Sequence, residues 1–236
     1  RVLSDDLAAN VTAKVSRMRR PPHIEVIVNP VDTTTPASPD SDTPYRRELG
    51  LGDATVFMYA GNLGHSQSLD LVVGAARRHT HRSDIAYVIN GGGVMADHIT
   101  RVAADIPNLT VIGYQPPERV SEVLATADVH LVLLKAGLSA SSVPSKAFSA
   151  LASARPLIAA IDIGTEVANV VSEAGAGLAV PPDDLEAFVA AVECLANDPD
   201  ARHLMGESGS AWIAERRSPA VVAGALATLA EELGTK

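Results

Sequence analysis

Residues 54–93 read ATVFMYAGNLGHSQSLDLVVGAARRHTHRSDIAYVINGGG, and this stretch decides the fold. Within it the apolar run 56–59 leads through two glycines into a helical pattern at 69–79, and a second apolar run follows at 85–89. A short apolar run, a helical stretch and another short apolar run are typical of a βαβ unit, whose two strands are parallel. The segment therefore predicts an α/β fold.

The same alternation continues from residue 54 to the end of the chain. The expected strands are residues 56–59, 85–89, 109–112, 129–134, 156–160 and 177–180. The expected helices between them are residues 69–79, 95–106, 118–126, 145–153, 165–173 and 185–197, with a last helix after Pro219. This order predicts a Rossmann-like, doubly wound parallel sheet, which binds ligands outside the carboxyl ends of its strands.

The segment before residue 54 has a different character. Residues 4–18 have the apolar spacing of a helix with Ser4 as its N-cap, and residues 24–28 have the β-branched composition of a short strand. Residues 33–44 are mostly Thr, Pro, Ser and Asp and have little to bury. We therefore divide the chain into the end of another domain with the start of a linker (1–35), a linker (36–53) and a ligand-binding domain (54–236).

Composition narrows the class of protein. Hydrophobic residues make up 47% of the chain and aromatic residues 3%, which suits a sheet covered by Ala-rich helices. The formal net charge of -9 would repel a nucleic-acid backbone, so nucleic acid is not an expected partner. The single cysteine, Cys194, lies in an apolar helical pattern and is expected to be a buried core thiol.

The two ends of the chain carry no targeting signal that we recognise. No signal peptide and no apolar run of membrane-spanning length is found, which predicts a cytoplasmic protein. The chain begins at Arg1 inside a helical pattern rather than at Met, so we expect it to be part of a longer protein.

Glycine-rich turns follow the first two expected strands. Gly61 and Gly64 follow the first strand, and Gly91 and Gly92 follow the second. Glycine lets backbone amides approach an anion closely, and the N-terminus of a following helix adds its dipole. Each turn is compatible with contact to a phosphate and equally with a tight turn that binds nothing.

The third and fourth strands also end in candidate binding segments. Tyr114 could stack on a base and Gln115 lies beside it, although a packing role is favoured for Tyr114. The hydroxyl-rich loop 135–146 leads into a helix that starts near Pro144. Lys146 in the first helical turn is unfavourable for the helix dipole unless an anion lies beside it. Its position favours a bound phosphate, with a solvated lysine as the alternative.

Other kinds of site are not indicated. The histidines have no HExxH or CxxC companion, so no metal site is expected, and His79 and His81 at a helix end are expected to be solvated. No Gly-x-Ser-x-Gly elbow and no Walker loop is found, which argues against hydrolase and P-loop functions.

Five segments, in this order, resemble the C-terminal half of family-4 glycosyltransferases, which have the GT-B fold. They are residues 24–32 (IEVIVNPVD), 59–63 (YAGNL), 90–93 (NGGG), 109–113 (LTVIG) and 143–159 (VPSKAFSALASARPLIA). The resemblance is strongest to bacterial members that build surface polysaccharides and lipid-linked sugars. It implies a retaining transferase that takes a UDP- or GDP-linked sugar without a metal ion or other cofactor and passes the sugar to a glycan or lipid-linked acceptor.

The resemblance also implies that the two domains of the enzyme have different roles. Residues 1–32 resemble the end of an N-terminal domain, whose larger part would bind the acceptor and carry a catalytic His or Asp, so no catalytic residue is assigned here. That absent half would also make any peripheral contact with the inner face of the membrane. The donor-binding residues implied for this chain are Gly61, Asn62, Gly64, Gln67, Gly91, Gly92, Tyr114, Gln115, Ser142, Ser145, Lys146 and Ser149.

Three of these positions depart from the family pattern. Asn62 and Gln67 stand where many members have Arg and Lys to grip the diphosphate, and Ser149 stands where a glutamate faces the ribose. Two further hypotheses therefore accompany glycosyl transfer: a non-catalytic nucleotide-binding or partner subunit and, less favoured, a nucleotide-sugar epimerase.

Overall fold

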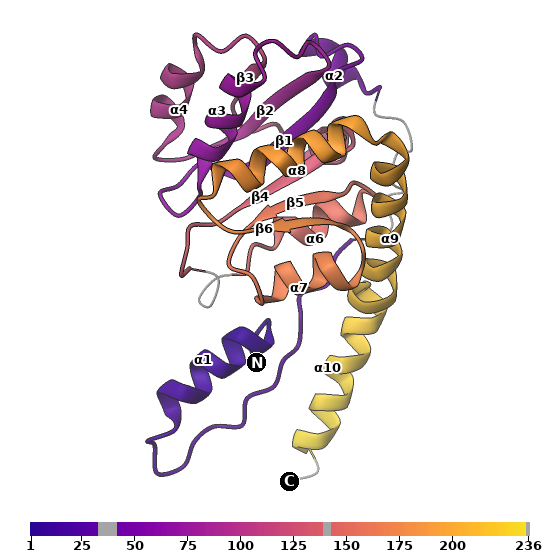
Figure 1. Cartoon of the computed structure of the whole chain (residues 1–236). Coiled ribbons are helices and arrows are strands. Elements are labelled where there is room, and N and C mark those ends of the chain that lie inside the picture. Colours follow the sequence, from indigo (N-terminus) through magenta and orange to yellow (C-terminus); the bar gives the residue numbers. More distant parts are fainter. Residues whose placement is uncertain (33–41, 139–142, 235–236) are drawn as a thin grey trace.

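A six-stranded parallel sheet forms the centre of the computed structural model, which describes residues 1–32, 42–138 and 143–234 (Figure 1). Its strands are β1 (Thr55–Asn62), β2 (Ile85–Gly92), β3 (Leu109–Ile112), β4 (Val129–Leu133), β5 (Leu157–Ala160) and β6 (Gly177–Val180). The six strands expected after residue 54 are confirmed, because short buried runs rich in Val, Ile and Leu suit a parallel sheet that is covered on both faces.

The strand order is β3-β2-β1-β4-β5-β6. β1 and β4 are therefore neighbours in the sheet although two strands separate them in the chain. The segment after β1 departs toward one side of the sheet, and the segment after β4 departs toward the other. A crevice therefore opens between the carboxyl ends of these two strands. The doubly wound topology predicted from the sequence is thus confirmed, and it defines where a ligand is expected.

Helices cover both faces of this sheet. The helices are α1 (Asp5–Val15), α2 (Pro44–Glu48), α3 (Leu69–Arg78), α4 (Ala96–Ala103), the short 3-10 helix η1 (Pro117–Arg119), α5 (Val120–Thr126), α6 (Lys146–Ala152), α7 (Glu166–Glu173), α8 (Leu185–Asn197), α9 (Pro199–Arg217) and α10 (Pro219–Gly234). Phe57 and Tyr59 of β1 pack into a core with α3, α4 and α8. Val56 and Met58 alternate with them and face α2 and α5, while α6, α7 and α9 cover the β4 and β5 part of that second face.

Helix α2 lies inside the segment 36–53 that we expected to be a linker, and the sequence analysis missed it. Tyr45 and Arg46 of this helix are buried. The Arg46 guanidinium donates to the Gly52 carbonyl at 2.9 Å and to the Asp128 carboxylate at 3.1 Å, so this short helix is fastened to the sheet. A polar segment with one buried arginine gives no apolar periodicity, which is why the helix was not predicted.

Helix α9 was also missed. It starts with an Asp198 cap and with Pro199 at its first position, two signals that could have identified it. Gly206 and Gly209 lower its helical propensity, yet they lie where α9 meets the α6 region, and a Cβ on Gly206 would collide with the Ala154 carbonyl oxygen. These glycines therefore serve close helix packing.

Helices α1 and α10 both lie below the sheet in the view of Figure 1. Helix α1 begins as expected, because the Ser4 hydroxyl accepts from the Leu7 amide at 3.1 Å, and α10 begins at Pro219. The expected strand at 24–28 is wrong: Val26 forms only an isolated bridge with Val2. Prolines on both sides of this segment limit a longer ladder.

Replacing Gly206 by alanine should destabilise the fold although alanine favours helices. The new Cβ must displace the Ala154 backbone, and such overpacking costs about 1–3 kcal/mol. Gly224→Ala in α10 is the matched control, because a Cβ there meets no atom within 4 Å and should add up to about 1 kcal/mol of stability. Thermal unfolding of both variants checks this, and equal shifts of Tm would contradict the packing role of Gly206.

Candidate functional site

The carboxyl ends of β1 and β2 form the floor of the candidate site. Gly61 pairs with Gly91 and Asn62 with Gly92, so the two glycine turns lie side by side. A Cβ on Gly91 would collide with the Gly61 carbonyl oxygen, and Gly61 has a φ of 147°, which favours glycine. Both glycines are therefore required for backbone geometry.

The turn after β1 is held by its own side chains. The Gly64 amide donates to Gln67 Oε1 at 3.0 Å, and Gln67 Nε2 donates to the Ser66 hydroxyl at 2.9 Å. Asn62 is exposed at the end of β1. An anion at this turn would have to compete with Gln67 for the Gly64 amide, so the turn offers fewer free amides than the sequence suggested.

The segment after β3 lies over the second glycine turn. Tyr114 is 63% exposed, and its hydroxyl donates to the Gly92 carbonyl at 3.1 Å. Gln115 Nε2 donates to the Gly113 carbonyl at 3.2 Å. Tyr114 therefore touches the turn while leaving most of its surface open to a ligand, rather than packing in the core.

Lys146 reaches the same place from α6. Its Nζ lies 3.6 Å from the centre of the Tyr59 ring, and a Cβ on Gly61 would lie only 3.3 Å from it. Burial lowers the pKa of the Lys146 ammonium from 10.5 to about 7. The solvated alternative for this lysine is therefore wrong: the side chain lies against the protein at the crevice between β1 and β4.

The two described serines near α6 are less favourably placed than Lys146 to bind an anion. Ser145 and Ser149 are both exposed, and Ser142 lies outside the described residues. The amides of Ala147 and Phe148 donate to the carbonyls of Pro144 and Ser145, so they are not free for an anion. Among the described residues, the start of α6 thus contributes mainly the Lys146 side chain.

Two carboxylates to which the sequence analysis gave no role at this site hold the loop that leaves β4. Both carboxylate oxygens of Asp162 accept from the Gly137 amide, at 2.9 and 3.1 Å. Asp183 accepts from the Ala136 amide at 3.3 Å and from the Ser68 hydroxyl at 2.6 Å. Both residues follow strands at the carboxyl edge, which is the signal that could have identified them. They fix the path of the loop beside the candidate site.

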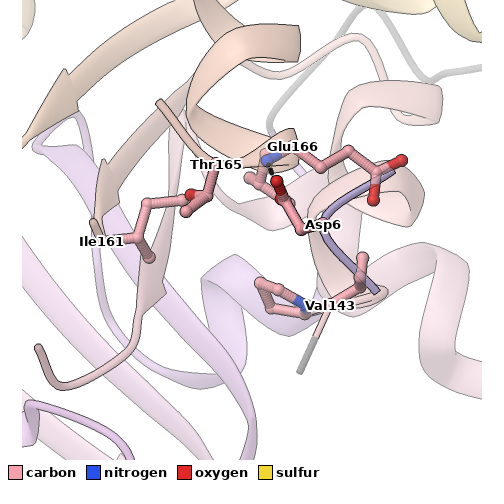
Figure 2. A pocket seen from close by; sticks show the side chains of 7 residues that line it. Asp6, Val143, Ile161, Thr165 and Glu166 are labelled. Carbon is pink, nitrogen blue, oxygen red and sulfur yellow. Dashed lines mark hydrogen bonds between the residues drawn. The ribbon is translucent and has the colours of Figure 1, made fainter. Parts of the chain in front are cut away.

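A small cavity lies next to this loop but is no ligand site. It is lined by Asp6, Val143, Pro144, Ile161, Thr165, Glu166 and Val167 (Figure 2). Its volume is about 10 Å³, which is room for at most one water. Figure 2 shows the Asp6 carboxylate pointing at the Glu166 amide, which donates to it at 2.7 Å. Asp6 therefore caps α7 and ties α1 to it.

Two sequence expectations away from this edge are wrong. His79 is buried, with Nδ1 2.7 Å from the Tyr87 hydroxyl, because the end of α3 turns its ring toward β2. Cys194 is exposed, because it lies on the outer side of α8. Within residues 1–32, 42–138 and 143–234, no cluster of three or more His, Cys, Asp and Glu side chains could hold a metal ion. None of the described helices is both long and apolar enough to cross a membrane.

Known proteins resemble this chain in sequence. The family described as "Glycosyl transferases group 1" matches residues 54–198. "Probable glycosyltransferase WbjE" of Pseudomonas aeruginosa is 28% identical over 148 residues, which are 62% of this chain and 37% of that protein. A GDP-mannose-dependent phosphatidylinositol monomannoside mannosyltransferase of Mycolicibacterium smegmatis is 28% identical over 181 residues, 74% of this chain and 47% of that one. The chain thus spans less than half the length of either relative.

A solved structure gives the same fold. HepE of Anabaena, crystallised with UDP-glucose, superimposes with a TM-score of 0.76 over 97% of this chain and 62% of that chain, at 15% identity. At this identity the likeness concerns the arrangement of the sheet and its helices alone.

Replacing Lys146 by methionine should stabilise the free chain near and below pH 7. A lysine in the unfolded chain stays charged up to a pKa of about 10.5, whereas the pKa of the folded Lys146 is about 7. Below pH 7 the folded state bears the full cost of the buried charge, and this cost disappears as the pH rises from 7 to 10.5. Thermal unfolding should show a gain of at least about 1 kcal/mol at low pH that shrinks toward pH 10.

The control for this measurement is Lys135→Met, because Lys135 is exposed and its loss should change stability little. A Lys146→Met variant that is less stable than the wild type throughout this pH range would show that the ammonium is not held in a desolvated position.

Proposed function

This chain belongs to the group 1 glycosyl transferases, and we propose that it is the half of such an enzyme that binds a nucleotide diphosphate sugar. The observation that carries the proposal is the position of the Lys146 ammonium, which lies beside the Gly61 turn in the crevice between β1 and β4. Crevices of this kind are where doubly wound sheets bind nucleotides. A lysine there can pair with a diphosphate.

The proposed reaction breaks the bond between the sugar C1 and the diphosphate oxygen. The bonding electrons leave with the diphosphate, and an acceptor hydroxyl oxygen forms the new bond to C1 and gives up its proton. Negative charge therefore grows on the diphosphate as the bond breaks. A positive charge fixed beside it stabilises that transition state more than the ground state. Lys146 supplies this charge, and the glycine turns leave room for the diphosphate.

The donor is a UDP- or GDP-linked sugar under this proposal. HepE was crystallised with UDP-glucose, and the mycobacterial relative is named as dependent on GDP-mannose, which supports these two bases. Under the same proposal Tyr114, which is exposed, stacks on the base, and Asn62, Gln67 and Gln115 are the neighbouring polar groups. Ser142, Ser145 and Ser149 complete the donor-binding set. No metal ion or organic cofactor is required.

The proposal leaves the acceptor site and the catalytic group to a domain outside this chain, since the matches cover less than half of either relative. We propose that a preceding domain binds a glycan or lipid-linked acceptor and supplies the catalytic group of a retaining transfer. Such an enzyme of polysaccharide assembly would work in the bacterial cytoplasm, at the inner face of the membrane.

A second candidate is a nucleotide-binding subunit without catalytic activity. It is favoured by one observation: Gln67 turns its side-chain oxygen to its own Gly64 amide, where many family members have a lysine for the diphosphate. Full-length protein that binds nucleotide but releases none from UDP- or GDP-sugars, with polysaccharide or lipid-linked acceptors present, would favour this candidate.

Calorimetric titration tests the proposed function directly. UDP or GDP should bind the chain with a Kd below about 1 mM, and the matching monophosphate should bind more weakly because it lacks the second phosphate. Inorganic phosphate serves as the control for simple anion binding. The absence of binding by both diphosphates would refute the proposal.

Lys146→Met should weaken binding of the same nucleotide about tenfold or more. A charge-assisted contact contributes about 1.5–3 kcal/mol, and methionine keeps the length of the side chain without its charge. Lys135→Met is again the control, since it removes an equal charge from an exposed position on the neighbouring loop. Equal affinities for the two variants would place the diphosphate away from Lys146.

A further inference from the structure

Tyr59 is a buried residue next to the proposed nucleotide site. It lies on β1 and is 0% exposed. One face of its ring lies 3.6 Å from Lys146 Nζ, and its hydroxyl donates to the Asn62 carbonyl at 2.6 Å. A single side chain thus touches both the lysine and the turn that the lysine approaches.

The ring face is a suitable surface for a buried ammonium. Aromatic rings attract cations to their faces, and this attraction is strongest where water is excluded. The Lys146 ammonium has no ion-pair or hydrogen-bond partner among the described residues, and burial disfavours its charge. Among the described residues, the Tyr59 ring is therefore the group that opposes this effect and holds the ammonium in place.

The hydroxyl of Tyr59 acts on the turn. By donating to the Asn62 carbonyl, it fixes the backbone between Gly61 and Gly64, where the chain must leave β1. Burial raises the pKa of this hydroxyl, so it stays protonated and keeps donating in the neutral pH range.

We infer that Tyr59 is the positioning residue of the nucleotide site: its ring seats the Lys146 ammonium against the Gly61 turn, and its hydroxyl sets the shape of that turn. The inference rests on the proposed function for its ligand, a nucleoside diphosphate. A nucleotide then meets a lysine that is already aimed at the diphosphate, so less ordering is needed on binding.

Tyr87 provides a matched control on the neighbouring strand. It is also 0% exposed, packs in the same core and bonds through its hydroxyl, but its partner is His79 at the other end of the sheet. A change at Tyr87 disturbs the core as much as one at Tyr59 and leaves Lys146 untouched.

The experiment changes the electron density of the ring face and keeps the shape of the side chain. The full chain is prepared with Tyr59→Phe and then with mono-, di- and trifluorophenylalanine at position 59, each fluorine weakening the attraction of the ring face for a cation. From phenylalanine to trifluorophenylalanine, affinity for UDP or GDP should fall progressively, by about threefold or more. The same series at position 87 should leave affinity unchanged. Comparison within the series removes the effect of the lost hydroxyl.

A second readout needs no nucleotide. The titration of Lys146, followed by NMR of the labelled lysine in the free chain, should move to lower pH with each fluorine at position 59 and stay in place for the series at position 87. A titration that does not move at position 59 overturns the inference. If the wild-type chain binds neither UDP nor GDP, the proposed function fails, and this titration still decides whether Tyr59 holds the lysine.

Discussion

The close approach of the Gly61 and Gly91 backbones is the constraint on which the candidate site depends. Parallel pairing carries β1 and β2 in register to their last residues, and at the Gly61 and Gly91 pair there is no room for a side chain. The missing Cβ of Gly61 also leaves the space into which Lys146 extends. Two glycines thus set both the floor of the site and the position of its positive charge.

The topology of the sheet brings the lysine to that floor. Because β1 and β4 are neighbours whose following segments depart to opposite sides, α6 starts across a crevice from the β1 turn. The loop between β4 and α6 is fixed where it leaves the sheet by the Asp162 and Asp183 carboxylates. The resulting site keeps the Lys146 ammonium partly desolvated and, among the described residues, without an ion-pair partner, which costs stability in the free chain and favours an anionic ligand.

The sequence predicted the six strands because each is a short apolar run between turn signals. It did not predict α9, because Gly206 weakens the helical pattern. This glycine is needed for a close contact with the Ala154 backbone, which is distant in the chain. The glycine turns and Lys146 were recognised as candidates, but the contact between Lys146 and Tyr59 was not. That contact depends on the course of the side chains across the crevice, which no local pattern encodes. The same holds for Gln67, whose bond to the Gly64 amide changes what the turn can offer a ligand.

We propose that the diphosphate lies between the Gly61 turn and the Lys146 ammonium, and a crystal structure of the chain soaked with UDP or GDP tests this most directly. We predict a phosphate oxygen within hydrogen-bonding distance of Lys146 Nζ, about 2.7–3.2 Å, with the base on the side of Tyr114. A nucleotide bound elsewhere on the sheet, with Lys146 still resting on Tyr59 and no phosphate near it, would contradict the account.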